Sequence, residues 1–221
     1  MVYVTHNLLY VPPILTQDSL SPLLQNQPNF KIVSGHINTF GLPMSLVKNK
    51  SVVAGVTNPW KWYVDFYVSL QNKQELLQVL GRGNTDFKSV LHTLTHALDV
   101  IPEPNSVVLW NTTNMNDVYD DYMCSGLGYC SWLFKTTYKN TPDFYINLNK
   151  TQSGFDTLLC LPESNSTVET DYINLYDEEM IDWVRFADSV YINCFKWTMT
   201  DTDTPSLYVK EDMDFPYSFT H

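Results

Sequence analysis

A regular alternation of side chains from Trp60 to Leu70 is the feature of this sequence that most limits how the chain can fold. Large apolar residues occupy the even positions of the run, and Tyr63 and Tyr67 lie among the odd ones. Alternation of aromatic and β-branched residues with a period of two is typical of a β-strand. The run therefore predicts a strand whose two faces are both covered, either by this chain or by a neighbouring one.

Shorter segments with the same preference for β-favouring residues recur along the chain. Between them lie stretches rich in Asn, Asp, Ser and Pro, which turn the backbone without the help of Gly. Their spacing of roughly ten residues in the second half is typical of an antiparallel sandwich or barrel. We expect strands at Phe30–Ser34, Val52–Val56, Ser106–Trp110, Phe144–Asn149, Phe155–Leu161, Thr167–Leu175, Val190–Trp197 and Leu207–Lys210.

Helical patterns occur in three places. Asn72 with Glu75 three residues later forms a capping-box pattern, and Gly81 and Gly83 end the short helix that follows. Apolar residues at spacings of three and four run from Phe87 to Ile101, where Pro102 stops the helix. The segment Asp177–Asp188 opens with three acidic residues, which interact favourably with the dipole of a helix N-terminus.

Together these patterns predict a mainly β fold. We expect an antiparallel sandwich, jelly-roll-like, with two or three helices inserted in its connections, and an α+β fold is the alternative. Residues 1–29 predict an extended N-terminal arm, because they contain many Pro, Gln and Ser residues and show no helical period. Residues 30–221 predict a single β-rich globular domain.

The charge of the chain excludes one class of partner and leaves others open. The formal net charge is −11, and the whole negative excess lies in residues 111–221, where 18 acidic residues face 6 basic ones. Phosphate backbones bind through Lys and Arg, so we expect no direct contact with nucleic acid. An acidic surface suits cationic partners, divalent ions or simple solubility.

The N-terminal sequence and the cysteines bear on the compartment. The first fifteen residues lack the charged and apolar regions of a signal peptide, and no apolar run is long enough to span a membrane. We expect synthesis inside a cell, with reduced cysteines and unused glycosylation sequons, and the final location is not predicted. The four cysteines are Cys124, Cys130, Cys160 and Cys194, and the sequons begin at Asn49, Asn111, Asn149 and Asn165.

His92, His96 and Asp99 form the most suggestive metal-binding pattern. Their spacing places all three on one side of a helix, where they have the chemistry to hold a transition ion. The zinc-peptidase helix motif, however, needs Glu directly after the first His, and Thr93 stands there. We therefore predict a solvent-facing stripe that binds no metal.

The remaining chemical candidates are weaker. Cys130 needs a His to activate it and an Asn or Asp to orient that His, and nothing in the sequence specifies either, so a buried, inert thiol is expected. The Gly-Arg-Gly at positions 81–83 follows a helix instead of opening one, so it reads as a helix stop. Acidic clusters that lack the calcium-loop spacing lie at Asp117/Asp120/Asp121, Asp177/Glu178/Glu179/Asp182, Asp201/Asp203 and Glu211/Asp212/Asp214.

The sequence therefore predicts no catalytic, cofactor-binding or metal-binding residue. We expect a non-enzymatic structural or assembly protein that acts through other protein chains, as a capsid-type component of a viral or phage particle. Sandwiches with inserted helices and ordered arms are frequent in capsids, so this step is an analogy of fold. Two alternatives stay open: a small acidic inhibitor or immunity-type protein that binds a cationic partner, and a hydrolase with an unrecognised site.

Overall fold

Two compact units make up the chain, and neither is continuous in sequence. The computed structural model describes residues 2–4, 8–11, 31–33, 50–96, 127–137, 142–158 and 170–213. Unit 1 contains Met1–Asn58, Phe134–Thr170 and Asn193–His221, and unit 2 contains Pro59–Leu133 and Asp171–Ile192. Contacts between segments that are distant in sequence therefore define both units.

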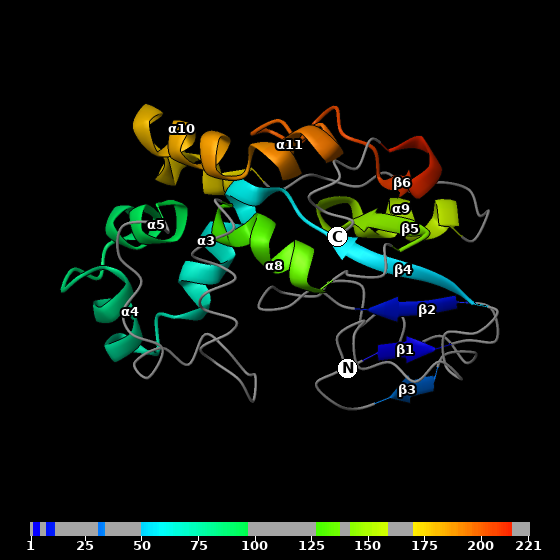
Figure 1. Cartoon of the computed structure of the whole chain (residues 1–221), viewed down its shortest axis with the longest axis horizontal. Helices are drawn as coiled ribbons and strands as arrows, with labels where there is room; N and C mark the ends of the chain where they lie inside the picture. The colour runs from blue at the N-terminus through cyan, green and yellow to red at the C-terminus, as the bar shows by residue number, and fades with distance from the viewer. Residues whose placement is uncertain are drawn as a thin grey trace. The chain divides into compact units, whose positions relative to one another are not determined.

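Unit 1 is built on one mixed sheet with the strand order β3-β1-β2-β4-β5-β6 (Figure 1). The neighbours β2, β4 and β5 run parallel, whereas β1 pairs antiparallel with β2 and β3, and β6 pairs antiparallel with β5. The strands are β1 (Val2–Val4), β2 (Leu8–Val11), β3 (Lys31–Val33), β4 (Ser51–Val56), β5 (Phe144–Asn147) and β6 (Leu207–Val209).

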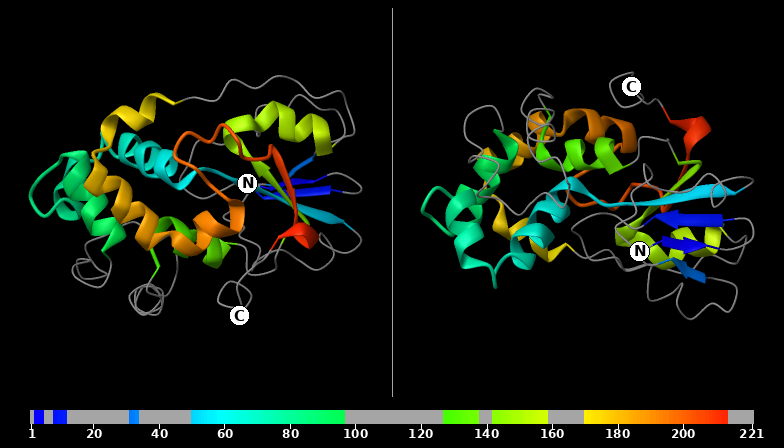
Figure 2. Two further views of the ribbon diagram at one scale, coloured as in Figure 1. Left: turned by 90° about the horizontal axis from the view of Figure 1, so that it is seen from above. Right: turned by 60° about the horizontal axis from the view of Figure 1, so that its bottom comes forward.

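β4 lies at the centre of this sheet and is buried over most of its length. Val53, Ala54 and Val56 are at most 2% exposed, and Val53 lies opposite Phe144 in the parallel pairing with β5. A nearly continuous apolar run is what a parallel strand with both faces covered requires. The helix α9 (Thr151–Leu158) contacts β5 and β6 and lies along the sheet, as Figure 2 shows.

Aromatic rings fill the interior of unit 1 around Phe195, which is fully buried. The rings of Phe134, Tyr145 and Tyr208 meet that of Phe195 edge to face, with centroids 5.1 to 5.4 Å apart. The Tyr208 hydroxyl also donates a 3.0 Å hydrogen bond to the carbonyl oxygen of Phe195. Edge-to-face pairs add to the stabilisation that burial of the rings provides.

Unit 2 is helical in its described part. Trp62 stacks on Phe66 at a centroid distance of 5.1 Å, and both rings pack against Tyr129. The unit contains α3 (Pro59–Ser69), α4 (Gln74–Leu80), α5 (Phe87–Thr95), η3 (Asp171–Leu175), α10 (Glu178–Ala187) and the first residues of α8 (Tyr129–Thr137) and α11 (Ser189–Phe195).

The predicted β-sandwich is wrong. The strands among the described residues form one mixed sheet, and the other regular elements are helices. The capsid-like, jelly-roll arrangement of two facing antiparallel sheets is therefore not the architecture of this chain. The error has one main source, which is the assignment of aromatic-rich helices as strands.

The run Trp60–Leu70 is the clearest case, because it forms the helix α3. Tyr63, assigned to the second face of a strand, is 1% exposed, whereas Val68, assigned to the apolar face, is 56% exposed. Trp62, Tyr63 and Phe66 lie at helical spacing and point inward together. Pro59 begins the helix at the position where its missing N–H is not needed.

Three further predicted strands are helical for the same reason. In Val190–Trp197, the buried residues Tyr191, Ile192 and Phe195 follow helical spacing, and the segment forms most of α11. The part of Phe155–Leu161 that is described belongs to α9, and that of Thr167–Leu175 to the 3-10 helix η3. The predicted strand Ser106–Trp110 lies outside the described residues.

Several predicted elements are confirmed. Strands occur within Phe30–Ser34, Val52–Val56, Phe144–Asn149 and Leu207–Lys210, as β3, β4, β5 and β6. The Asp177–Asp188 helix is α10, and Asp177 caps it by accepting a 2.9 Å hydrogen bond from the Met180 N–H.

The two other predicted helices form as α4 and α5. The cap residue of α4 is Lys73 and not Asn72, and Gly81 ends that helix. α5 ends at Thr95 with His96 as its C-cap, so the predicted uninterrupted helix to Ile101 is wrong at His96, and residues 97–101 lie outside the described residues.

The N-terminal segment contains two strands of the sheet. β1 and β2 lie inside residues 1–29, where we expected an extended arm, and they pair with each other. β1 also pairs with β3, and β2 with β4, so that β2 connects the N-terminal strands to the centre of the sheet.

The helical geometry of α3 predicts different costs for two truncations. Residues 66 and 68 share a face in a strand but not in a helix. Phe66→Ala should lower the free energy of unfolding by about 3–5 kcal/mol because it empties a buried site. Val68→Ala should change it by less than about 0.5 kcal/mol because the side chain faces solvent. Urea unfolding of both variants measures this difference, and equal losses would contradict the helix.

Candidate functional site

Polar side chains gather in unit 1 where two parallel strands end. Thr57 and Asn58 directly follow β4, Asn147 is the last residue of β5, and Asn149 stands two positions further on. Asn58 and Asn147 are fully buried, and Asn58 Nδ2 donates to the Thr198 carbonyl oxygen at 2.6 Å. The carboxyl ends of parallel strands are where ligands bind in α/β sheets. This edge of the sheet is therefore a candidate ligand site.

The carboxamide of Asn147 holds the segment that leads into β6. Its Nδ2 lies 3.3 Å from both carboxylate oxygens of Asp201 and 3.2 Å from the Pro205 carbonyl oxygen. Its Oδ1 accepts a 2.9 Å hydrogen bond from the Asn149 backbone N–H. A carboxamide offers donors and an acceptor at once, which this position needs and a carboxylate does not supply.

Asp201 brings a carboxylate into the interior of unit 1. Its backbone has a φ of 55°, in the left-handed region that Asp tolerates better than most residues. Asn149 Nδ2 donates to its Oδ2 at 2.7 Å, and the Thr57 hydroxyl donates to Asn149 Oδ1 at 3.2 Å. Burial raises the pKa of Asp201 to about 6, while hydrogen bonds from Asn149 and Asn147 and the charge of Lys150 act in the opposite direction.

Lys150 binds the same segment through hydrogen bonds to the backbone of that segment. Its Nζ donates to the carbonyl oxygens of Thr202 and Thr204, at 3.1 and 2.5 Å. Both acceptors are neutral, and no described carboxylate forms an ion pair with this ammonium group. A positive charge is therefore held at a fixed place beside the segment.

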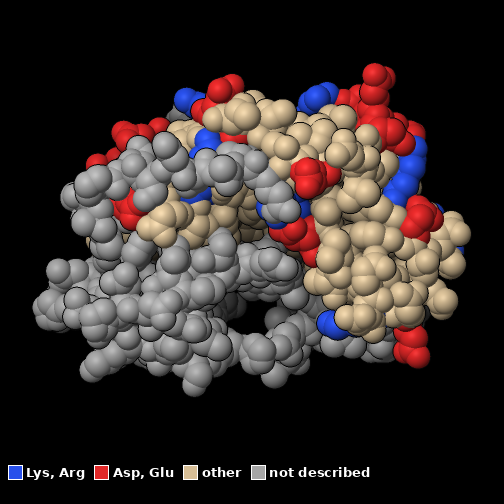
Figure 3. Space-filling model, turned by 180° about the vertical axis from the view of Figure 1, so that it is seen from behind, with Lys and Arg blue, Asp and Glu red and all other residues tan. Residues whose placement is uncertain are grey.

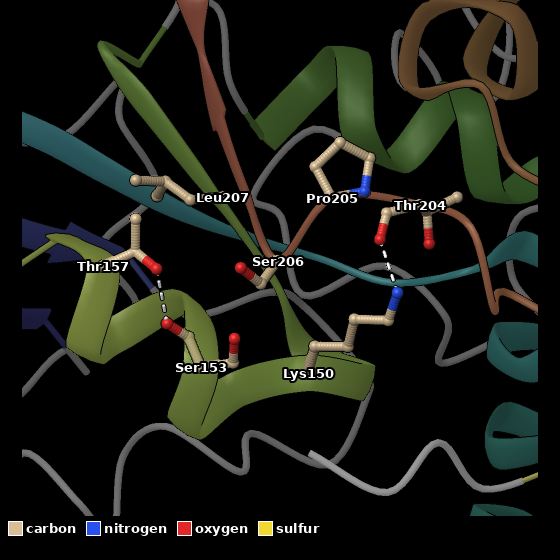
Figure 4. Close-up of a pocket in the computed structure, with 7 residues that line it drawn as sticks. All are labelled: Lys150, Ser153, Thr157, Thr204, Pro205, Ser206 and Leu207. Atoms are coloured by element: carbon tan, nitrogen blue, oxygen red, sulfur yellow. Dashed lines mark hydrogen bonds between the residues drawn. The ribbon is translucent and has the colours of Figure 1, made fainter. Parts of the chain in front are cut away.

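An open pocket of about 340 Å³ lies between α9 and the start of β6, and Figure 4 shows its lining. Gly154 lets the two walls meet, because a Cβ there would lie 2.4 Å from the Ser206 carbonyl oxygen. The volume falls in the range of small-molecule pockets, which is roughly 300–1,000 Å³. The lining residues are Lys150, Ser153, Thr157, Thr204, Pro205, Ser206 and Leu207.

His92 and His96 lie together in unit 2, stacked on each other with ring centroids 4.2 Å apart. The edge of each ring meets Trp183, and His96 Nδ1 lies 3.0 Å from the His92 carbonyl oxygen. Asp99 lies outside the described residues. Within the described ranges, no group of three or more His, Cys, Asp or Glu side chains is placed to hold a metal ion.

Cys130 lies in α8 and is 4% exposed. Burial raises the pKa of its thiol well above the usual range, and the charge of Asp188 adds to this effect. Both effects disfavour the thiolate, which is the nucleophilic form. Cys130 and Cys194 form no disulfide, while Cys124 and Cys160 lie outside the described residues.

Asp188 is the central polar group of unit 2, where it ends α10 and is fully buried. Its carboxylate accepts hydrogen bonds from the Tyr63 hydroxyl at 2.7 Å and from the Ser131 N–H and hydroxyl at 2.8 and 2.5 Å. A Cβ on Gly128 would lie 2.6 Å from both carboxylate oxygens, so this position requires glycine. Burial raises the pKa of Asp188 to about 6, and the hydrogen bonds from Ser131 and Tyr63 oppose that shift.

The other acidic clusters face solvent. Asp177 and Glu179 pair with Lys88 at 2.9 and 2.7 Å, and Asp182 pairs with Arg185. Exposed pairs of this kind contribute little stability. Figure 3 shows acidic side chains spread over one face of the described surface, with basic ones among them. Asp203, Glu211 and Asp212 are exposed, whereas Asp214 and the cluster at Asp117, Asp120 and Asp121 lie outside the described residues.

Sequence reasoning missed most of the site in unit 1. From the sequence, Asn149 is the end of a predicted strand and the start of a glycosylation sequon, and Asp201 belongs to an acidic cluster. The available signal was the sequence Asn-Leu-Asn-Lys at the end of a correctly predicted strand. Amides and a lysine at the end of a buried strand mark a position where polar groups enter the interior.

Comparisons with known proteins add no family to this picture. Searches of the chain against protein-family models, curated proteins and solved structures found no significant match. In the described residues, no helix has the length and apolar character needed to cross a membrane.

The buried carboxylate of Asp188 predicts a pH dependence of stability. Its pKa in the folded protein, about 6, lies above the value of 3.8 that applies when the chain is unfolded. The folded state therefore binds the proton more tightly, and stability falls as the pH rises from about 4 to about 6. The free energy of unfolding of Asp188→Asn, relative to that of the natural chain, should rise by about 2 kcal/mol as the pH increases from about 4.5 to about 7.5. Urea unfolding across this range measures the gain, and a difference that does not change with pH would contradict it.

Proposed function

We propose that unit 1 binds a small, hydroxyl-rich molecule in the pocket between α9 and the start of β6. The supporting observation is that hydrogen bonds from the buried Asn147 and the half-buried Lys150 hold the wall of the pocket in place. Asn147 binds the Pro205 carbonyl oxygen, and Lys150 binds that of Thr204. A wall held in this way is largely formed before the ligand arrives, which is typical of ligand sites.

The chemistry of the lining favours binding over hydrolysis. The hydroxyl-bearing residues Ser153, Thr157, Thr204 and Ser206 line the pocket, and Pro205 and Leu207 add apolar surface. Hydroxyl groups both donate and accept hydrogen bonds, which matches the hydroxyls of a sugar or polyol. The lining contains no carboxylate, thiol or imidazole, the groups that general acid–base catalysis most often uses. The sequence-based prediction of a non-enzymatic protein stays a prediction.

Blocking the pocket tests the proposal. Thr157 is an exposed residue of the pocket wall, and Gln152 is an exposed residue of the same helix that does not line the pocket. Ligand-detected NMR with glucose, galactose, mannose and their 6-phosphates should detect binding of at least one probe. Thr157→Phe should weaken that binding at least tenfold because the ring occupies the space of the ligand, and Gln152→Phe should leave it unchanged.

Two results would contradict the proposed function. One is the absence of binding by every probe, and the other is equal binding by Thr157→Phe and the natural chain. Circular dichroism of both variants should show that the helix and the sheet persist. A loss of affinity in Thr157→Phe then reports on the pocket and not on unfolding.

A function through protein contacts is the second candidate, and one observation favours it. Phe186 on α10 is 88% exposed, and the exposed acidic residues Asp182 and Glu179 stand four and seven positions before it on the same helix. An exposed aromatic residue with a charged rim is a common anchor for a partner. The capsid-type version of this prediction rested on the sandwich fold, so that analogy no longer supports it. The version in which an acidic protein binds a cationic partner does not depend on the fold.

Light scattering at two protein concentrations separates the versions of this second candidate. Growth of the average mass with concentration would favour self-assembly. A constant monomer mass would favour either the pocket alone or a separate cationic partner. Phe186→Ser should abolish any self-assembly that depends on this anchor, and Val68→Ser, another exposed apolar residue, serves as the matched control.

A further inference from the structure

We infer that Lys150 forms a subsite for an anionic oxygen group, such as a phosphate, sulfate or carboxylate, on the ligand of the pocket. This inference rests on the proposed function, because it assigns a chemical class to the ligand of the same pocket. It depends on the charge of Lys150, on the N–H group that its two hydrogen bonds leave over, and on the polar residues around it.

Among the described residues, no ion pair neutralises the charge of Lys150. Its two hydrogen-bond acceptors are the carbonyl oxygens of Thr202 and Thr204, which carry no net charge. The carboxylate of Asp201 interacts with the Lys150 charge, but it is committed to hydrogen bonds from Asn147 and Asn149. A fixed ammonium group whose acceptors are neutral attracts an anion from solution.

The ammonium group also retains a donor. A lysine ammonium has three N–H groups, and two of them serve the two carbonyl oxygens. These bonds hold Nζ beside Thr204, which lines the pocket together with Lys150 itself (Figure 4). Hydrogen bonds in which the donor or the acceptor is ionised are about twice as strong as neutral ones, and an anionic acceptor adds charge attraction to the ammonium group. The third N–H is therefore the strongest single contact that the described pocket offers to a ligand.

The surroundings of Lys150 suit a ligand that combines an anionic group with hydroxyl groups. Ser153 lies on the first turn of α9, three residues after Lys150, and Ser206 lies on the opposite wall. The described lining contains no carboxylate that would repel an anion. A phosphorylated sugar has both kinds of group, so it serves as the probe.

A matched pair of probes tests the inference. Glucose and glucose 6-phosphate differ only in the charged group, so the ratio of their dissociation constants isolates its effect. The natural chain should bind glucose 6-phosphate at least tenfold more tightly than glucose. Lys150→Met should reduce the ratio to near one, and Lys210→Met should leave it unchanged, because Lys210 is exposed and outside the pocket.

A salt series on the natural chain keeps the test independent of the variant's folding. Raising sodium chloride from about 20 to about 300 mM should weaken glucose 6-phosphate binding several-fold, because it shortens the range of the charge interaction, and should leave glucose binding unchanged. Equal affinities of the two probes, or equal salt dependence, would overturn the anion subsite while leaving the pocket intact. Absence of binding by every sugar and sugar phosphate probe would overturn the proposed function and this inference with it.

Discussion

The need to satisfy two fully buried carboxylates organises the described parts of this protein. Asp201 in unit 1 and Asp188 in unit 2 have no exposed surface. A carboxylate removed from water destabilises the fold unless donors surround it. The donors to Asp201 come from the end of β5, and those to Asp188 come from α3 and α8, so each carboxylate ties together segments more than fifty residues apart in sequence.

This constraint explains why the pocket lies where it does. The parallel pairing of β4 with β5 brings the Thr57 hydroxyl and the Asn149 amide within hydrogen-bond distance. Both residues lie just beyond the ends of these apolar strands. The hydrogen bonds that Asp201 accepts from Asn147 and Asn149 hold the segment before β6 at the ends of these strands. Lys150 secures the far side of that segment, and the space left between it and α9 is the pocket. The proposed ligand site is therefore a consequence of how the polar groups are satisfied.

Local chemistry made some elements predictable. α10 was predicted from the acidic first turn at Asp177, and β4 from an apolar run of β-branched residues, because capping and burial act within a few residues. α3 was missed because its aromatic residues satisfy a strand period and a helix period at once. Such a run folds according to the partners that cover it, and a single sequence does not name those partners. The same ambiguity turned Val190–Trp197 into a predicted strand.

The sequence by itself determined the apolar segments that form the interior, several helix ends and the acidic surface. It also determined the residue types of the site, the amides and lysine that follow the strand at Phe144–Asn147. Only the tertiary structure decided that these side chains meet Asp201, because that contact spans more than fifty residues and depends on the pairing of β5 with β6. Hydrogen bonds of this range depend on which strands become neighbours. That choice belongs to the packing of the whole sheet, which no local pattern of residues encodes.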